Sequence, residues 1–350
     1  MFKIKLCVIF GGMSTENEVS RISGKYILSN LDINKYEIFP IYIDKTGKWY
    51  EYKGKYDEIE MGKKLEKVQK IDNIIEYLKK LDVIFPVLHG LYGEDGTIQG
   101  LFELLKIPYV GCKVLASSIG MDKAYTKIIF EKAGIKQTKS RYIRKLKNKY
   151  IYIDDRLDEE TLELGKTCDK VQTEMKYPMF IKPSNSGSSV GVSKARNIEE
   201  LKNAIEEASK YDNKIIIEEG IDGKEVECAV LGNEEVLAGE VGEIKAADEF
   251  YSYDAKYNNE ESKTVIPANL EQEKIQEIKR LAIKAFKAID GKGLSRVDFF
   301  VENKTGEIYL NEINTMPGFT QISMYPKLME SYGISYKELL DKLISLAIYK

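Results

Sequence analysis

The chain has 350 residues, of which 43% are hydrophobic and 31% charged, a balance typical of a soluble globular protein and unlike a disordered or collagen-like chain. The 53 basic and 56 acidic residues give a net charge of −3, so the basic excess of a nucleic-acid-binding protein is absent. No apolar run approaches the roughly 18–20 residues of a membrane span, so neither nucleic acid nor a membrane is expected as a partner.

The cysteine and histidine content indicates the redox environment of the protein and limits the mechanisms that it can use. The four cysteines are widely scattered and include no C-x-x-C pair: Cys7, Cys112, Cys168 and Cys228. This usage favours a reduced, cytoplasmic protein. The apolar residues 1–10 run directly into a Gly-Gly pair without a cleavage site, so we predict a buried strand there and no signal peptide. The single histidine, His89, excludes any mechanism or metal site that needs two.

Strands and helices alternate in the first third of the chain. The predicted strands cover residues 4–10, 36–43 and 82–88, and the predicted helices cover about 17–31 and 97–105. Alternation of this kind implies a mostly parallel sheet. Ligands tend to bind beyond the carboxyl ends of such strands, where the loops 11–16 and 89–96 lie.

The rest of the chain predicts antiparallel structure. A helix at 122–133 precedes a strand near 139–143, a polar stretch over 144–166, a strand–loop–strand over 179–192, a helix at 198–210 and a strand at 214–219. Further strands at 225–231, 235–241, 294–301 and 307–313 accompany a long helix at 270–289 and a polar loop over 244–262. The length corresponds to two or three domains of about 100–200 residues, and we expect them over 1–121, 122–217 and 218–350.

A Ser/Gly-rich loop, S-N-S-G-S-S-V-G at 184–191, follows a short strand that ends near Lys182. Small residues let backbone N–H groups approach anionic oxygens, and a lysine at the loop mouth adds positive charge. The loop lacks the Walker A order, and the Gly-Gly pair at 11–12 does not continue as G-x-G-x-x-G, which argues against a dinucleotide-binding dehydrogenase. On its own, such a loop is also typical of a plain hairpin.

Two consecutive strands carry polar residues with matching spacing. S-R-V-D at 295–298 and N-E-I-N at 311–314 put Arg296 with Asp298, and Glu312 with Asn314, on one face of each strand, because residues two apart point the same way. Carboxylates, an amide and a guanidinium on one surface suit a hard cation beside a phosphate, since Mg²⁺ prefers oxygen ligands. The alternative is a surface ladder of salt bridges.

Two further segments carry weaker signals. In E-E-G-I at 218–221, a strand end that turns through glycine can present backbone groups to an adenine edge and leave Glu225 for a ribose; an acidic loop is the plain alternative. T-M-P-G-F-T-Q-I-S at 315–323 contains a Pro-Gly turn, whose Gly318 N–H is a candidate oxyanion donor. A helix N-terminus follows it, and such termini attract carboxylates.

Five motifs in order resemble the ATP-grasp ligases, and specifically the D-alanine–D-alanine ligase family, over essentially the whole chain. They are G-G-M-S-T-E-N-E-V-S at 11–20, F-P-V-L-H-G-L-Y-G-E-D-G-T-I-Q-G at 85–100, I-K-P-S-N-S-G-S-S-V-G at 181–191, S-R-V-D-F-F at 295–300 and N-E-I-N-T-M-P-G-F-T at 311–320. The resemblance implies an α/β and α+β protein with the three-lobed ATP-grasp fold and an N-terminal parallel-sheet domain. ATP would lie between the central and C-terminal lobes.

The resemblance also implies a reaction. ATP would phosphorylate the carboxylate of one D-alanine, and the amino group of a second D-alanine would attack the acyl phosphate. The products would be D-Ala-D-Ala, a peptidoglycan precursor, with ADP and phosphate. Phosphoryl transfer needs positioning and charge neutralisation and no protein nucleophile. A lid that excludes water would protect the acyl phosphate, and the polar loop 244–262 fits that role.

A nucleotide and metal role follows for each matching residue. The ATP phosphates would contact Lys123 and Lys182, and Lys256 would reach the γ-phosphate. Adenine would contact Glu218 and the backbone of Glu219 and Ile221. The ribose would contact Glu225. Two Mg²⁺ ions, with Mn²⁺ as an alternative, would be bound by Asp298, Glu312 and Asn314.

A second set of residues would bind the substrates. Glu16 would hold the ammonium of the first D-alanine in a hydrogen-bonded triad with Ser188 and Tyr257, and His89 would lie near the substrate carboxylate. Arg296 and the Gly318 N–H would stabilise the oxyanion. Ser323, beside Met324, would bind the carboxylate of the second D-alanine.

Departures from the family pattern and related activities define the alternatives. Glu219-Gly220 stands where many relatives carry a basic and then a bulky residue, but a backbone contact to adenine survives that change. The resemblance leaves a D-Ala–D-Ser or D-Ala–D-lactate ligase as the alternative; Tyr257 and Met324 match the alanine type. A regulatory module that has lost catalysis is disfavoured, because the metal and oxyanion residues are all present. The family tends to dimerise, so a homodimer is compatible with the resemblance, although no sequence feature marks an interface.

Overall fold

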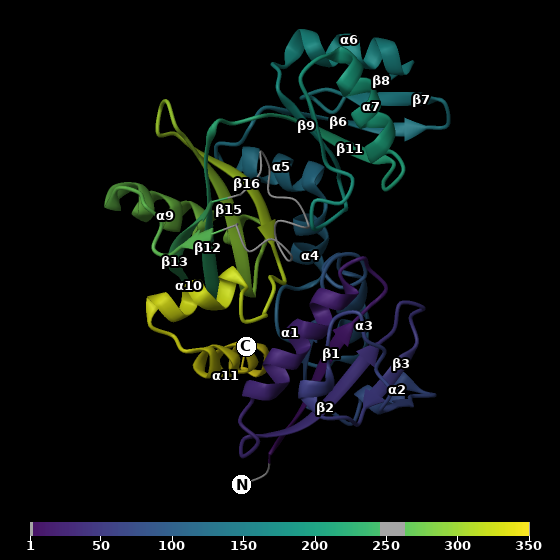
Figure 1. Cartoon of the computed structure of the whole chain (residues 1–350), viewed down its shortest axis with the longest axis vertical. Coiled ribbons are helices and arrows are strands. Elements are labelled where there is room, and N and C mark those ends of the chain that lie inside the picture. The colour runs from purple at the N-terminus through teal and green to yellow at the C-terminus, as the bar shows by residue number, and fades with distance from the viewer. Residues whose placement is uncertain (1–2, 246–262, 350) are drawn as a thin grey trace.

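Three sheets are arranged along the molecule in the structure, a computed structural model that describes residues 3–245 and 263–349. The first sheet lies near one end of the long axis, the second near the other end, and the third between them (Figure 1). The structure therefore has the α/β and α+β character that the sequence predicts.

The first sheet has the order β4-β3-β2-β1-β5. β1 (Ile4–Gly11) pairs in parallel with β2 (Tyr36–Ile43) and β5 (Val83–Val87), as predicted. Two strands that were not predicted, β3 (Trp49–Tyr52) and β4 (Val68–Lys70), add an antiparallel edge. Runs of three and four residues are too short to show a period. The helical segments of this part are α1 (Asn17–Asn30), η1 (Tyr56–Glu58), α2 (Ile74–Leu78), α3 (Thr97–Leu105) and α4 (Val114–Met121).

The second sheet is antiparallel, with the order β10-β9-β11-β6-β7-β8. Its strands are β6 (Ser140–Leu146), β7 (Lys149–Ile153), β8 (Glu159–Leu162), β9 (Met179–Pro183), β10 (Ser193–Ala195) and β11 (Lys214–Glu219). The helices are α5 (Lys123–Lys132), α6 (Leu164–Glu174) and α7 (Ile198–Ala208). Side chains of α6 and α7 share one buried cluster with the sheet. The expected polar stretch 144–166 in fact contains β7 and β8. The residues of β8 are mostly exposed and charged, which hides its strand pattern, whereas β7 (K-Y-I-Y-I) is a mostly buried apolar run between charged neighbours.

The third sheet is also antiparallel, with the order β14-β13-β12-β15-β16. Its strands are β12 (Gly223–Gly232), β13 (Val236–Lys245), β14 (Lys263–Val265), β15 (Gly293–Glu302) and β16 (Ile308–Asn314). Helix α9 (Gln272–Ala288) covers one face, while α10 (Met324–Tyr332) and α11 (Tyr336–Ile348) contribute to a buried cluster on the other.

Strand alternation separates the core from the polar face of the third sheet. Val297 and Phe299 pack in the cluster with α9, so the even-numbered Arg296 and Asp298 point to the opposite face. The register pairs Asp298 with Glu312 and Arg296 with Asn314, which confirms the predicted placement of these four side chains on one surface. The pairing then shifts by one residue after Asp298, a bulge that the sequence pattern did not reveal.

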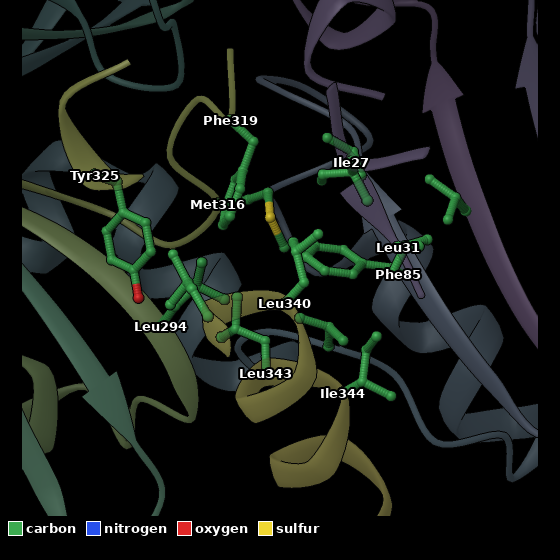
Figure 2. Close-up of a cluster of buried hydrophobic side chains, with 14 of the residues drawn as sticks. Ile27, Leu31, Phe85, Leu294, Met316, Phe319, Tyr325, Leu340, Leu343 and Ile344 are labelled. Carbon is green, nitrogen blue, oxygen red and sulfur yellow. The ribbon is translucent and has the colours of Figure 1, made fainter. Parts of the chain in front are cut away.

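A hydrophobic cluster joins the last helix to the first sheet (Figure 2). Side chains of α11 meet those of α1 and β5, and Met316 and Phe319 from the loop after β16 pack among them. Phe319 lies 5.8 Å from Phe85, ring centre to ring centre, in an edge-to-face contact. Burying each large apolar side chain contributes roughly 1.5–3 kcal/mol. The cluster therefore holds the loop 315–323 firmly against the N-terminal part of the chain.

The three expected domain ranges each contain one sheet, except that β11 extends to Glu219; the exact boundaries stay a prediction. Across residues 3–245 and 263–349, no helix combines the length and the apolar character that crossing a membrane would require.

Candidate active site

A cavity of about 550 Å³ lies where the three sheets meet. It brings together loops that are far apart in the sequence: the turn at Glu16, the loop around Ser188, and the strand ends near Arg296 and Glu312. Of the predicted site residues that the structure describes, all but Asp298 line this cavity. Asp298 is 2% exposed and lies beneath Arg296, to which it is bonded.

The Ser/Gly-rich loop reaches across to the first sheet. Ser188 Oγ donates a hydrogen bond to Glu16 Oε1. Ser188 and Ser189 have φ values of 50° and 58°, a left-handed conformation that L residues adopt at a cost in strain energy. A Cβ at Gly187 would lie only 2.6 Å from Glu16 Oε2, so the close approach requires glycine there. The loop is thus built around one carboxylate rather than being a plain hairpin.

Glu16 sits just before α1 and is 8% exposed. A second glycine, Gly90, also faces it, and a Cβ there would come within 2.5 Å of Glu16 Oε2. Two loops therefore close on the same acid from opposite parts of the chain. A buried carboxylate in a polar cavity is suited to bind a cationic group.

His89 is held by two neighbours. Its Nδ1 lies 3.0 Å from the Met316 carbonyl oxygen, and its Nε2 lies 3.0 Å from Ser23 Oγ. Since a carbonyl only accepts, we assign the proton to Nδ1 and infer that Ser23 donates to Nε2. Burial lowers the pKa of His89 despite the opposing influence of Glu16. The neutral ring therefore connects α1 to the loop after β16 by hydrogen bonds. Its contact with a substrate carboxylate stays a prediction.

The end of the cavity where the resemblance would place the nucleotide holds a buried ion cluster. Glu218 Oε2 lies 2.6 Å from Lys182 Nζ, and Glu218 Oε1 lies 2.6 Å from Lys127 Nζ. Burial alone would raise the pKa of Glu218, but the two lysines hold it well below its usual range. The Lys123 ammonium donates to the Ser186 carbonyl oxygen at 2.8 Å and lies 3.7 Å from Glu312 Oε2. Lys127 was not among the predicted site residues, because a lysine inside a helix carries no local signal.

The strand that follows supplies the rest of this end. The Glu219 side chain accepts a hydrogen bond from the Lys176 N–H at 2.8 Å and is thereby turned away to the chain surface. The expected contact of the Glu219 backbone with adenine is compatible with this orientation and stays a prediction. Ile221 and Glu225 line the cavity beside it.

Arg296 is the centre of a second buried cluster. Its Nε and Nη2 donate to the two carboxylate oxygens of Asp298 at 2.8 and 2.6 Å, and its Nε also lies 3.0 Å from Glu227 Oε2. Burial alone would lower the pKa of Arg296, but Asp298 and Glu227 raise it well above its ordinary value. Glu227, on the neighbouring strand, was not predicted, because its register opposite Asp298 appears only in the folded sheet.

The donors around Asp298 fit a divalent cation. Asn314 Nδ2 donates to Asp298 Oδ2 at 3.0 Å, and Glu312 is the cross-strand partner of Asp298. In the part of the chain that the structure describes, no three His, Cys, Asp or Glu side chains form a metal cage. Two carboxylates and one amide are what Mg²⁺ takes from a protein when substrate phosphates complete its shell.

The loop after β16 borders the opposite side of the cavity. Ser323 Oγ accepts from the Thr320 N–H at 2.9 Å and lies 2.8 Å from Thr320 Oγ1, at the start of α10. Met324 is 7% exposed and lines the cavity beside Ser323 and Gly318. Lys256 and Tyr257 lie outside the described residues, as does most of the predicted lid 244–262; Ile244 and Lys245 belong to β13.

Two family models together match most of the chain. Residues 5–112 match the model described as D-ala D-ala ligase N-terminus, and residues 147–345 match the D-ala D-ala ligase C-terminus. The chain belongs to the D-alanine–D-alanine ligase family. It is 52% identical to the D-alanine–D-alanine ligase of Acetivibrio thermocellus, over 99% of this chain and 96% of the relative. Identity to the enzyme of that name from Clostridium novyi is 49%, over 99% and 98%.

Solved structures agree with this assignment. The VanG D-Ala:D-Ser ligase of Enterococcus faecalis is similar at a TM-score of 0.85 and 38% identity, covering 99% of this chain and all of that one. The D-alanine-D-alanine ligase of Coxiella burnetii is similar at 0.80 and 32%, covering 99% and 94%. The ATP-grasp resemblance drawn from the five motifs is confirmed.

Glu94 also lines this cavity, and it was not among the predicted site residues. Its carboxylate accepts hydrogen bonds from the Gly90 N–H at 2.7 Å and the Met316 N–H at 3.0 Å. It therefore ties the histidine loop to the loop after β16. Burial and the nearby Glu16 charge raise the pKa of Glu94 to about 8, against the two N–H groups and Arg296. The signal was available in G-E-D-G at 93–96, but its target lies more than two hundred residues away.

The raised pKa of Glu94 predicts a pH-dependent penalty. Unfolded glutamate ionises above about pH 4.3, whereas folded Glu94 keeps its proton up to about pH 8. Stability from this residue is complete below pH 4 and is lost as the pH rises toward 8. Glutamine does not ionise, but it accepts through one oxygen only and leaves one of the two N–H groups without its acceptor. We therefore expect the free energy of unfolding of Glu94→Gln, relative to wild type, to rise by about 1–3 kcal/mol from pH 5 to pH 8. Denaturant titrations at several pH values measure this slope; parallel curves for the two proteins would contradict the assignment.

Proposed function

We propose that the chain joins two D-alanine molecules with hydrolysis of ATP to ADP and phosphate, and so makes D-Ala-D-Ala for a peptidoglycan precursor. One observation carries this proposal: a single cavity holds an amine-binding acid, Glu16, a lysine cluster around Lys182 and a carboxylate–guanidinium cluster around Arg296. Those three parts correspond to an amino-acid ammonium, the nucleotide and the reacting carboxyl group. The buried free cysteines are compatible with a cytoplasmic setting, where ATP is available.

In the first step, a carboxylate oxygen of D-alanine attacks the γ-phosphorus and ADP leaves. Glu16, held by Ser188, binds the ammonium of that alanine and fixes its carboxylate toward the phosphates. Lys123 and Lys182 neutralise phosphate charge, Glu218 with the backbone at Glu219 and Ile221 holds adenine, and Glu225 holds the ribose. Bound Mg²⁺, which Asp298, Glu312 and Asn314 would hold, supplies further neutralisation of the phosphate charge.

In the second step, the neutral amine of another D-alanine attacks the acyl carbon, and the proton that it loses is taken up by the departing phosphate. The tetrahedral intermediate carries an oxyanion, which Arg296 and the Gly318 N–H stabilise. Collapse of that intermediate breaks the carbon–oxygen bond to phosphate and leaves the peptide bond. Ser323, at the start of α10, binds the carboxylate of the second alanine.

The reaction is tested with purified protein, ATP and Mg²⁺, with and without D-alanine. We expect ADP release to depend on D-alanine and to match D-Ala-D-Ala formation mole for mole, as resolved by mass spectrometry. L-alanine serves as the control substrate and should leave ADP release at its background rate. ADP release that is indifferent to D-alanine would contradict the proposal.

A D-Ala–D-Ser ligase is the second candidate, because the structural likeness to the VanG D-Ala:D-Ser enzyme is strong. Met324 argues against it. This side chain is 7% exposed beside Ser323 and offers no hydrogen bond to a serine hydroxyl. Burying an unpaired hydroxyl costs about 1–3 kcal/mol.

We therefore expect D-Ala-D-Ala to exceed D-Ala-D-Ser at least about fivefold when both second substrates are equally abundant. A competition assay with mass detection measures the ratio. Met324→Gln, which adds an amide beside the hydroxyl, should shift the ratio toward serine, while the apolar control Met324→Leu should not. Dominance of D-Ala-D-Ser in the wild-type protein would favour the second candidate.

A further inference from the structure

A buried lysine lies behind the nucleotide end of the cavity. Lys127 is on α5 and is 8% exposed. Glu218 and Thr138 line the cavity, and Lys127 contacts both of them from the protein side. A buried lysine is costly unless its charge is paired, and Glu218 is the acid that pairs with this ammonium.

Lys127 and Lys182 both pair with the Glu218 carboxylate, and Lys182 is also the lysine proposed to contact the phosphates. Glu218 is 4% exposed and lies between Lys127 on one oxygen and Lys182 on the other, both at 2.6 Å. Thr138 Oγ1 donates to the same oxygen as Lys127, at 3.2 Å, and Lys127 Nζ lies 3.3 Å from that hydroxyl. Beyond Lys182, the acids that act on this cluster are Glu312 and Glu225.

The two lysines face different demands when a nucleotide binds. Lys182 lines the cavity, so phosphate oxygens compete with Glu218 for its ammonium. Lys127 lies outside the cavity wall and stays with Glu218. Without Lys127, a buried carboxylate that has lost Lys182 would have no cation beside it and would take up a proton near neutral pH. A protonated carboxyl presents a donor where an ionised carboxylate only accepts.

That difference decides which purine fits. The 6-amino group of adenine is a donor, and the 6-oxo group of hypoxanthine or guanine is an acceptor. We propose that Lys127 is a positioning residue that keeps Glu218 an ionised acceptor while Lys182 engages the phosphates, and that it thereby makes the site select 6-aminopurine over 6-oxopurine nucleotides. The inference rests on the proposed function, because it takes Glu218 as the group that meets the base.

The test measures binding of ADP and of inosine 5′-diphosphate to the full chain by calorimetry, with Mg²⁺, at pH 6 and pH 8. Both ligands carry the same diphosphate, so the ratio of their affinities cancels phosphate titration. Wild-type protein should prefer ADP about tenfold or more at both pH values, since an unpaired polar group is rejected strongly in a buried site. Lys127→Met should lower that ratio at least about fivefold at pH 6 and less at pH 8.

Three variants keep the result interpretable. Lys127→Arg retains the charge and should restore the wild-type ratio. Lys127→Gln removes only the charge and keeps a donor for Thr138, so it gives the same readout as Lys127→Met if the methionine variant does not melt cooperatively. Lys132→Met, on the exposed side of the same helix, is the control and should behave as wild type.

The outcomes separate two hypotheses. A folded Lys127→Met or Lys127→Gln protein with the wild-type ratio at both pH values would overturn the role of Lys127 alone. A wild-type protein without preference for ADP would overturn the adenine assignment of Glu218, and this inference with it. Because no alanine is present, the ligation reaction itself does not affect either result.

Discussion

Glu312→Gln is expected to lower turnover about 10²–10³-fold while the protein stays folded. Glu312 lies directly across from Asp298 in the third sheet and 3.7 Å from the Lys123 ammonium, at the edge of the cavity. The amide keeps the shape of the side chain but removes the negative charge that a divalent cation requires. Since 26% of the Glu312 side chain is exposed, its loss of charge leaves no fully buried ion without a partner. The free energy of unfolding should therefore change by about 1 kcal/mol or less.

The measurement is D-alanine-dependent ADP release as a function of Mg²⁺ concentration. In the variant, the Mg²⁺ concentration for half-maximal activity should rise in addition to the fall in kcat. Glu307→Gln is the matched control, because Glu307 is an exposed acid just before the same strand and pairs with Lys136. Unchanged turnover and an unchanged Mg²⁺ requirement in Glu312→Gln would refute the cation assignment.

Arg296→Lys is expected to reduce kcat about 10²-fold with little change in the KM for ATP. The guanidinium donates two parallel hydrogen bonds to Asp298 and also contacts Glu227. A lysine keeps the charge but not the fork, so it satisfies the carboxylates less well and presents no fixed donor to an oxyanion. Since the oxyanion forms only during the reaction, the loss should fall on kcat rather than on nucleotide binding.

Arg296→Met extends the same argument to stability. It would leave Asp298 and Glu227, 2% and 3% exposed, without their cation, at an expected cost of about 3–5 kcal/mol in free energy of unfolding. Arg280→Lys, at an exposed position on α9, is the control for the general effect of replacing arginine by lysine in Arg296→Lys. If kcat in Arg296→Lys equals that of wild type while the melting temperature is unchanged, Arg296 does not stabilise the oxyanion.

Local pattern was sufficient for much of the fold and for the polar face of β15 and β16. Alternation along S-R-V-D and N-E-I-N placed four polar side chains on one surface, and the register of β15 with β16 confirms it. The parallel arrangement of β1, β2 and β5 followed from strand–helix alternation. The misses were short strands such as β4, whose three residues show no period, and β8, whose exposed charges hide one.

What the sequence by itself determined is the chemistry within single segments: the Ser/Gly-rich loop, the paired strands and the order of the five motifs. Those features depend on periods of two or a few residues, which each segment carries alone. Only the tertiary structure decided which segments meet. It placed Glu16 under Ser188, Glu94 between two loops, Glu227 beside Arg296, and Lys127 behind Glu218. These contacts depend on strand register and on how the three sheets pack. Both are set by burial of apolar surface between segments that are far apart in the sequence, so the pattern around a single residue does not encode them.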